Sequence, residues 1–208
     1  MEKFIKTLWI WLVKLRGWKL IIPDKKDRPE LDRCVFVVAP HTSADDFLFG
    51  AAFLWSCSVN GKVFIKKEFF FWPLGPFLRM MGCIPIDRSN QRNVVVGTAV
   101  EAFKNEKDLS IAITPEATRK PQKRWKHGFW EIARQANVPI VPAYLNFRTK
   151  TIGVFDTIIP TDNFEADLRK IRSLYNSKMA KYPEGFIDLK DWDYLTKRSI
   201  WKFLDTFF

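Results

Sequence analysis

The sequence predicts an α/β fold: a central, mostly parallel β-sheet flanked by helices, preceded by an amphipathic N-terminal helix. Short runs rich in β-branched and aromatic residues alternate along the chain with longer segments whose apolar residues recur at helical spacing. Polar residues follow several of these runs directly, as is typical where parallel strands end at one edge of a sheet. At 208 residues the chain is long enough to bury a substantial core.

The N-terminal segment predicts an amphipathic helix over residues 2–16, with lysines on its polar side. Its apolar residues recur every three or four positions: Phe4, Leu8, Trp11, Leu12 and Leu15. Such a helix either packs on the core or lies in a membrane interface, with its aromatic side chains at headgroup level. A charged linker over residues 23–29 follows, so we expect residues 1–30 to be an appendage of a main domain formed by residues 31–208.

From residue 34 onward the expected elements alternate regularly. Strands are expected over residues 34–39, 61–65, 84–86, 109–113, 138–145 and 150–155, the last of these at an edge. Helices are expected over residues 46–57, 92–105, 128–136, 164–180 and 192–206. Prolines in the aromatic segment 69–78 prevent a long helix there, so that segment forms either a plug in the core or a surface for lipid.

Composition restricts the partners without choosing among them. The net charge is +11, and the chain has nine tryptophans and nineteen phenylalanines. Such a chain suits nucleic acid, an anionic membrane surface or an acidic or phosphorylated substrate. The cysteines, Cys34, Cys57 and Cys83, lack the spacing of a zinc site, so we expect no metal and no other cofactor. We also expect no secretory signal and no membrane span, because no apolar run approaches about 20 residues.

A histidine and an acid are brought together where the strand 34–39 meets the next helix. His41 lies in the turn, and Asp46 lies in the first helical turn. A carboxylate in that position accepts a hydrogen bond from one ring nitrogen and leaves the other to take a proton. This is the base and its orienting partner without a protein nucleophile beside them. The alternative is structural, because carboxylates also cap helix N-termini.

Two further strand ends carry polar side chains. Asp87 and Arg88 follow the strand 84–86, and Glu116 and Arg119 follow the strand 109–113. If these strands run parallel, the two loops converge on the loop that carries His41. Arginine suits a planar, bidentate grip on phosphate or carboxylate. The three loops together therefore favour one polar pocket.

Four segments of the chain resemble the ordered sequence blocks of the glycerolipid acyltransferases, the superfamily of 1-acylglycerol-3-phosphate acyltransferase. The segments are His41-x4-Asp46, Gly82 to Arg88, Pro115 to Arg119, and Val138 to Pro142. Their order, spacing and flanking strands agree with that superfamily over residues 34–145. The sequence looks like a compact bacterial branch of it.

The resemblance implies that residues 31–208 are an acyltransferase domain, in which His41 is the general base and Asp46 its partner. The acceptor site would comprise Asp87, Arg88, Glu116, Thr118 and Arg119. The acyl-chain or donor side would comprise Val138, Pro139, Ile140 and Lys126.

The same resemblance implies the reaction and its partners. The donor would be an acyl thioester on coenzyme A or acyl carrier protein, and the acceptor a hydroxyl or amine of a lysophospholipid-like molecule. The protein would be cytoplasmic and peripheral on the inner face of the cell membrane, bound to its anionic surface. No nucleic acid would be a partner.

The third block departs from the usual pattern, with Thr114 in place of Phe and Ala117 in place of Gly. A positive φ at position 117 would be costly for alanine, so we expect a reshaped loop or a position that tolerates a side chain. We expect no catalytic role for His127. Two other classes stay open: a nucleic-acid-binding module, from the net charge, and a metal-dependent hydrolase. The hydrolase would use as ligands His41, Asp45, Asp46 and Glu116.

Overall fold

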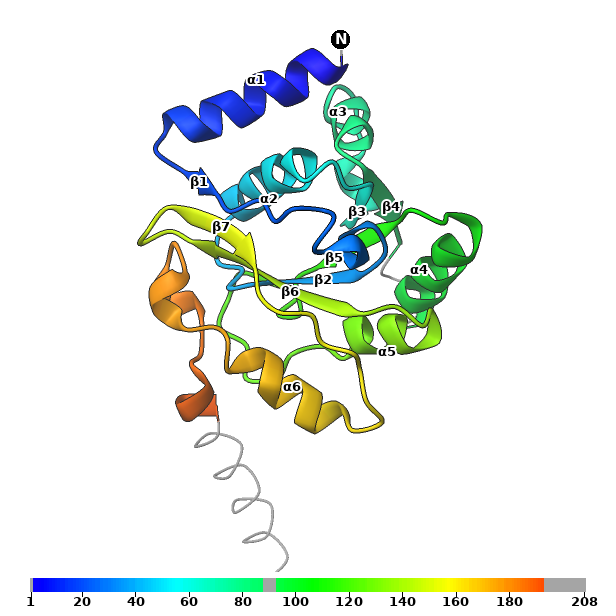
Figure 1. Ribbon diagram of the computed structural model, residues 1–208, viewed down its shortest axis with the longest axis vertical. Coiled ribbons are helices and arrows are strands. Elements are labelled where there is room, and N and C mark those ends of the chain that lie inside the picture. Colours follow the sequence, from blue (N-terminus) through cyan, green and yellow to red (C-terminus); the bar gives the residue numbers. More distant parts are fainter. Residues whose placement is uncertain (1, 88–92, 193–208) are drawn as a thin grey trace, which may run out of the picture.

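The computed structural model describes residues 2–87 and 93–192, and it places a seven-stranded sheet at the centre of the molecule (Figure 1). The strand order is β1-β7-β6-β2-β5-β3-β4. The strands are β1 (Lys19–Leu20), β2 (Val35–Ala39), β3 (Gly61–Lys66), β4 (Cys83–Ile86), β5 (Ser110–Ile113), β6 (Ile140–Asn146) and β7 (Thr151–Val154). Strands β2 to β6 run parallel, and β7 is antiparallel to β6. The predicted α/β fold with a mostly parallel sheet is confirmed.

Helices cover both faces of the sheet, as Figure 1 shows. On one face lie α1 (Glu2–Leu15), α2 (Asp45–Ser56) and α3 (Leu74–Met80), and on the other lie α4 (Asn93–Asn105), α5 (Gly128–Gln135) and α6 (Phe164–Arg172). A hydrophobic core lies on each face of the sheet. Successive side chains of β2 point to opposite faces, so Val35 and Val37 pack in one core and Phe36 packs in the other. Because β2 is buried on both faces, the strand reads as a continuous apolar run.

Two expected elements differ from the structure. The helix expected over residues 164–180 ends at Arg172, and short 3₁₀ turns follow at Ser177–Met179 and Pro183–Gly185. The chain turns there because Tyr175 is drawn into the core, where its hydroxyl donates to the carbonyl of Val37 at 2.8 Å. Strand β7 is also not an edge, since β1 pairs with its outer side. The helix expected over residues 192–206 lies outside the described residues.

Helix α1 packs on α2 through a face that its apolar stripe did not predict. Val13 is buried, and the indole nitrogen of Trp9 donates to the carbonyl of Leu48. The stripe itself is largely exposed: the exposed fraction is 70% for Phe4 and 56% for Trp11. After α1, β1 joins the sheet, so the expected appendage contacts the main domain at two elements.

The aromatic segment 69–78 is a surface rather than a plug in the core. Phe70 packs partly against the third hydrophobic cluster. Four neighbouring aromatic side chains are exposed: Phe69, Phe71, Trp72 and Phe77. The core alternative is therefore wrong for most of the segment. No helix in the described part of the chain has the length and apolar character to cross a membrane.

Candidate active site

The parallel direction of β2 and β5 brings the first and third blocks together. The two strands are hydrogen-bonded neighbours, so the loops that follow them leave the same edge of the sheet. The backbone N–H of His41 donates to Glu116 Oε1 at 3.0 Å. The convergence expected for these two loops is therefore present, and we call this edge the catalytic rim, defined by His41, Asp46 and Glu116.

At the catalytic rim, His41 and Asp46 form a hydrogen-bonded pair. His41 Nδ1 lies 3.0 Å from Asp46 Oδ2, and the same oxygen accepts from the backbone N–H groups of Thr42 and Ser43 at 2.9 Å. Asp46 is 3% exposed and Ala44 precedes it as the N-cap of α2, so the carboxylate also lies at a helix N-terminus. Because a carboxylate accepts, Nδ1 carries the proton of this hydrogen bond. The His41 side chain remains 20% exposed, so the pair is not sealed from solvent.

Glu116 lies beneath the His41 loop and is almost fully buried. Burial raises the pKa of Glu116 to about 7, partly offset by its backbone hydrogen bonds and by the charges of His41 and Arg172. Its other oxygen, Oε2, is buried without a hydrogen-bond partner among the described residues. Glu116 therefore holds the backbone of the loop and does not reach out toward solvent.

Ala117, which follows this glutamate, has a φ of +57°. The loop thus holds an alanine in the left-handed backbone conformation that a glycine would adopt without strain. Thr118 is half-buried and Arg119 is exposed at the same loop, beside His41 in the fold.

The second block lies farther along the rim. Asp87 follows β4, and in the sheet order β5 and β3 separate that strand from β2. Its carboxylate pairs with the ammonium of Lys67, whose pKa it raises. Arg88 lies outside the described residues. The structure therefore puts Asp87 on the same edge as His41 without joining the two side chains.

The fourth block begins at the amino ends of the parallel strands, opposite the catalytic rim. Ile140 is paired with Val35 at the start of β2, whereas Tyr144 is paired with Ala39 at its end. Val138 and Pro139 precede Ile140 and line a cavity of about 310 Å³ at that edge. The structure does not bring these three residues to His41. Lys126 is exposed, and its backbone N–H donates to the carbonyl of Pro115 in the third block.

Comparison with known proteins is consistent with this geometry. The sequence profile of the Acyltransferase family matches residues 21–146, more than half of the chain. The chain belongs to this family.

The chain has curated relatives with related names. It is 30% identical over 149 residues to the 1-acyl-sn-glycerol-3-phosphate acyltransferase of Limnanthes alba, covering 62% of this chain and 52% of the relative. It is 29% identical over 133 residues to a probable 1-acyl-sn-glycerol-3-phosphate acyltransferase of Mycoplasma pneumoniae, covering 62% of this chain and 49% of the relative. The chain thus spans about half the length of these curated relatives.

The fold of this chain is also found in a solved structure. The crystal structure of the 1-acyl-sn-glycerophosphate acyltransferase PlsC from Thermotoga maritima matches with a TM-score of 0.57 and 18% identity. The match covers 83% of this chain and 76% of that one.

The segment from Lys181 to Gly185, which the sequence did not indicate, supports the loop that carries His41. Lys181 pairs with Asp45, and the backbone N–H of Tyr182 donates to Thr42 Oγ1 at 3.2 Å. A Cβ on Gly185 would lie 2.8 Å from Thr42 Cγ2, so the close approach requires glycine. Only the turn-forming Pro183 and Gly185 hinted at a bend, and nothing local links them to residues some 140 positions earlier.

The alternative metal site has no support in the described residues. Among them, no three His, Cys, Asp or Glu side chains are grouped closely enough to hold a metal ion. Asp45 turns to Lys181, and Glu116 turns to the backbone of His41. His127, the other histidine, forms an exposed pair with Glu131 at 3.0 Å.

Proposed function

We propose that this acyltransferase transfers a fatty acyl group from a thioester of coenzyme A or acyl carrier protein to a lysophospholipid-like acceptor. The acceptor atom is a hydroxyl oxygen or an amine nitrogen. The observation that carries the proposal is the His41–Asp46 pair, in which Nδ1 is engaged at 3.0 Å while the histidine side chain stays 20% exposed. The names of the relatives from Limnanthes alba and Mycoplasma pneumoniae support a glycerolipid acceptor.

In the proposed mechanism His41 acts as general base. Its Nε2 takes the proton from the acceptor as the acceptor oxygen or nitrogen attacks the thioester carbonyl. The tetrahedral intermediate then collapses, the carbon–sulfur bond breaks, and the thiolate takes the proton back from the imidazolium. Backbone N–H groups stabilise the oxyanion in between. Asp46 stabilises the imidazolium and holds the ring, so no acyl-enzyme is required.

We assign the acceptor side to the loop that follows β5 and, beyond it, to the second block. Thr118 and Arg119 lie on the loop that is hydrogen-bonded to His41, and an arginine there would grip a phosphate in bidentate fashion. Asp87, at the end of β4, lies farther along the same edge, and we assign Arg88 to the acceptor from its place in the second sequence block. Glu116 acts through the backbone of His41 and positions it.

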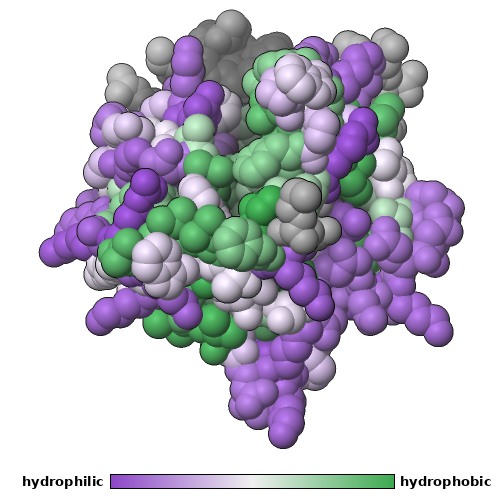
Figure 2. Space-filling model, turned by 90° about the horizontal axis from the view of Figure 1, so that it is seen from above, coloured by the Kyte–Doolittle hydropathy of each residue, from purple (hydrophilic) through white to green (hydrophobic). Residues whose placement is uncertain are grey.

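We also propose that one face of the molecule docks on the inner, anionic surface of the cell membrane. Figure 2 shows hydrophobic side chains running across the face seen from above. Exposed apolar residues come from α1, from the segment before α3 and from α3 itself: Phe4, Leu8, Trp11, Leu15, Phe69, Phe71, Trp72 and Phe77. We call these residues the apolar face. Patches of this kind in soluble proteins mark contacts with membranes or other proteins, and basic residues nearby contribute on the order of 1 kcal/mol each at anionic lipid.

The test is acyl transfer by the purified protein with labelled acyl thioesters. Lysophosphatidic acid, glycerol 3-phosphate, other lysophospholipids and acylated amino acids are offered as acceptors. We expect a lipid product, and we expect His41→Ala to reduce its formation by roughly 10²- to 10⁴-fold.

His127→Ala is the matched control, because it removes the other histidine from an exposed pair away from the rim. It should keep wild-type activity. Full activity in His41→Ala, or no product from any donor and acceptor, would contradict the proposal.

A further inference from the structure

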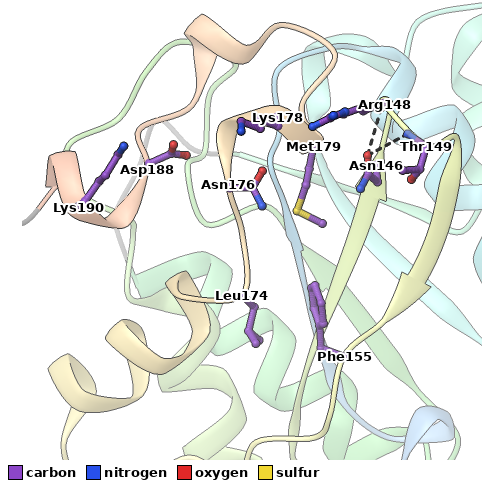
Figure 3. Close-up of a pocket in the computed structure, with 10 residues that line it drawn as sticks. All are labelled: Asn146, Arg148, Thr149, Phe155, Leu174, Asn176, Lys178, Met179, Asp188 and Lys190. Carbon is purple, nitrogen blue, oxygen red and sulfur yellow. Dashed lines mark hydrogen bonds between the residues drawn. The ribbon is translucent and has the colours of Figure 1, made fainter.

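A cavity of about 650 Å³ lies beside the catalytic rim, at the carboxyl end of β6 (Figure 3). Asn146 ends that strand, and Arg148 and Thr149 continue into the turn toward β7. The opposite wall is the segment after α6, which includes Asn176 and Lys178. The volume of the cavity lies within the range of roughly 300–1,000 Å³ typical of small-molecule sites.

The lining of this cavity suits an anion with a flat, partly apolar body. Figure 3 shows Lys178 and Arg148 reaching toward the same end of the cavity, with Phe155 and Leu174 at the other end. Among the described residues, neither cation forms an ion pair. A guanidinium and an ammonium together suit phosphate oxygens, while the apolar floor suits an aromatic ring.

The acidic side chain of the lining does not cancel this charge. Asp188 accepts hydrogen bonds from both the backbone N–H and the hydroxyl of Ser177, so its carboxylate is held against its own wall. Lys190, another exposed cation, lies beside it in the lining. The cavity therefore keeps a net positive lining.

The cavity is close to His41 but separate from it. Its wall at Met179 is tied to the β6–β7 turn, since the N–H of Phe147 donates to the carbonyl of Met179 at 2.9 Å. Three residues later, the N–H of Tyr182 donates to Thr42 of the catalytic loop. Three residues span at most about 11 Å, so a molecule anchored in the cavity reaches the rim through a short arm.

We propose that this cavity binds the phosphorylated nucleotide end of coenzyme A, and that Arg148 and Lys178 contact its phosphates. The inference rests on the proposed acyl transfer and names the donor. In coenzyme A a flexible pantetheine arm separates the adenosine phosphates from the thioester. A cationic cavity set apart from His41 on the same edge of the sheet matches that separation. An acyl carrier protein would instead require an extended docking surface.

The first experiment measures binding of adenosine 3′,5′-bisphosphate by calorimetry, which needs no activity. We expect the double variant Arg148→Ala, Lys178→Ala to weaken binding roughly 10-fold or more, because hydrogen bonds to charged phosphates are lost. Lys107→Ala is the matched control, as an exposed lysine just before β5 at the opposite edge of the sheet. It should bind as the wild type does.

The second experiment uses kinetics to identify the occupant. In the double variant, KM for acyl coenzyme A should rise roughly 10-fold. KM for the acceptor and for a short acyl-pantetheine thioester should stay constant, and kcat should change little.

Three outcomes would overturn the proposal. One is unchanged binding of the bisphosphate. Another is a rise in KM for the acceptor alone, which would assign the cavity to the acceptor phosphate. A third is a rise in KM for acyl carrier protein without one for acyl coenzyme A. Loss of transfer in the wild type with intact bisphosphate binding would instead count against the proposed reaction.

Discussion

The catalytic rim and the apolar face depart in opposite ways from the usual distribution of side chains. At the rim, two carboxyl side chains are almost fully buried: Asp46 is 3% exposed and Glu116 is 4% exposed. At the apolar face, Trp72 is 84% exposed and Phe4 is 70% exposed. Buried carboxyl groups and exposed aromatic patches both cost stability in an isolated, soluble domain.

The difference lies in what compensates each region. Asp46 Oδ2 accepts three hydrogen bonds and Glu116 Oε1 accepts one from the His41 backbone, so the rim is organised before substrate arrives. At the apolar face, the described residues leave Trp72 and Phe4 largely uncovered. The comparison teaches that the polar groups of the rim are held by hydrogen bonds within the chain, whereas the aromatic side chains of the apolar face are left exposed by the described residues.

The largest expected effect concerns the buried carboxyl of Glu116. Below pH 4.5 this group is protonated in both the folded and the unfolded chain, so its full contribution to stability is present. Between 4.5 and about 7 the unfolded chain releases the proton first, and the free energy of unfolding falls by about 3 kcal/mol. Glu116→Gln should remove this pH dependence, as measured by urea unfolding from pH 4.5 to 8.

The glutamine can still accept the N–H of His41, and any constant cost of the substitution leaves the pH-dependent part unaffected. Glu101→Gln, at an exposed site on α4, serves as the matched control for loss of a carboxylate. A constant difference between wild type and Glu116→Gln over the pH range would show that burial of the carboxyl at the rim is not costly.

A smaller effect is expected at the apolar face. Phe71→Ser and Trp72→Ser should each lower the partition of the protein onto anionic vesicles by roughly 10-fold, because a large apolar side chain no longer enters lipid. Vesicle co-sedimentation measures this directly. Ile159→Ser is the control: Ile159 is apolar and 70% exposed but lies outside the apolar face, so this variant should bind vesicles as the wild type does. Equal loss in all three variants would remove the distinction between the two regions.

The smallest effect returns to the rim, at Ala117. Its φ of +57° is unfavourable for any residue with a Cβ, so Ala117→Gly should raise the free energy of unfolding by about 0.5–1 kcal/mol. Ala166→Gly, at an exposed position in α6, should lower it by a similar amount, because helical glycine is unfavourable. Chemical denaturation of both variants measures the two changes in the free energy of unfolding, which should have opposite signs. Destabilisation by Ala117→Gly would mean that this loop is not strained.

Local patterns in the sequence were sufficient where the structure depends on neighbours in the chain. The strand from Val35 to Ala39 and the pairing of His41 with Asp46, five positions apart, followed from hydrophobic runs and helix-start chemistry. The parallel sheet was predicted from the alternation of strands and helices. Because its strands run parallel, the loops with Glu116 and His41 lie at the same end of the sheet and contact each other.

The features that the sequence did not predict depend on contacts between residues far apart in the chain. The end of α6 depends on the burial of Tyr175 against β2 and β6, which no helical pattern contains. The support of the catalytic loop by Lys181 and Tyr182 joins positions about 140 residues apart. The packing of α1 on α2 was also not predictable from α1 alone. The apolar stripe that includes Trp11 suits either the core or a membrane interface, and the structure leaves Trp11 exposed.

The most direct test of the account is a double-mutant cycle on the His41–Asp46 pair. Acyl transfer is measured as kcat/KM for wild type, His41→Ala, Asp46→Asn and the double variant, with circular dichroism to check folding. If Asp46 acts by orienting and stabilising the His41 ring, each single variant loses roughly 10²- to 10⁴-fold. The double variant then loses no more than His41→Ala alone, because the two groups act as a unit. Losses that multiply in the double variant would contradict the pair as one catalytic device.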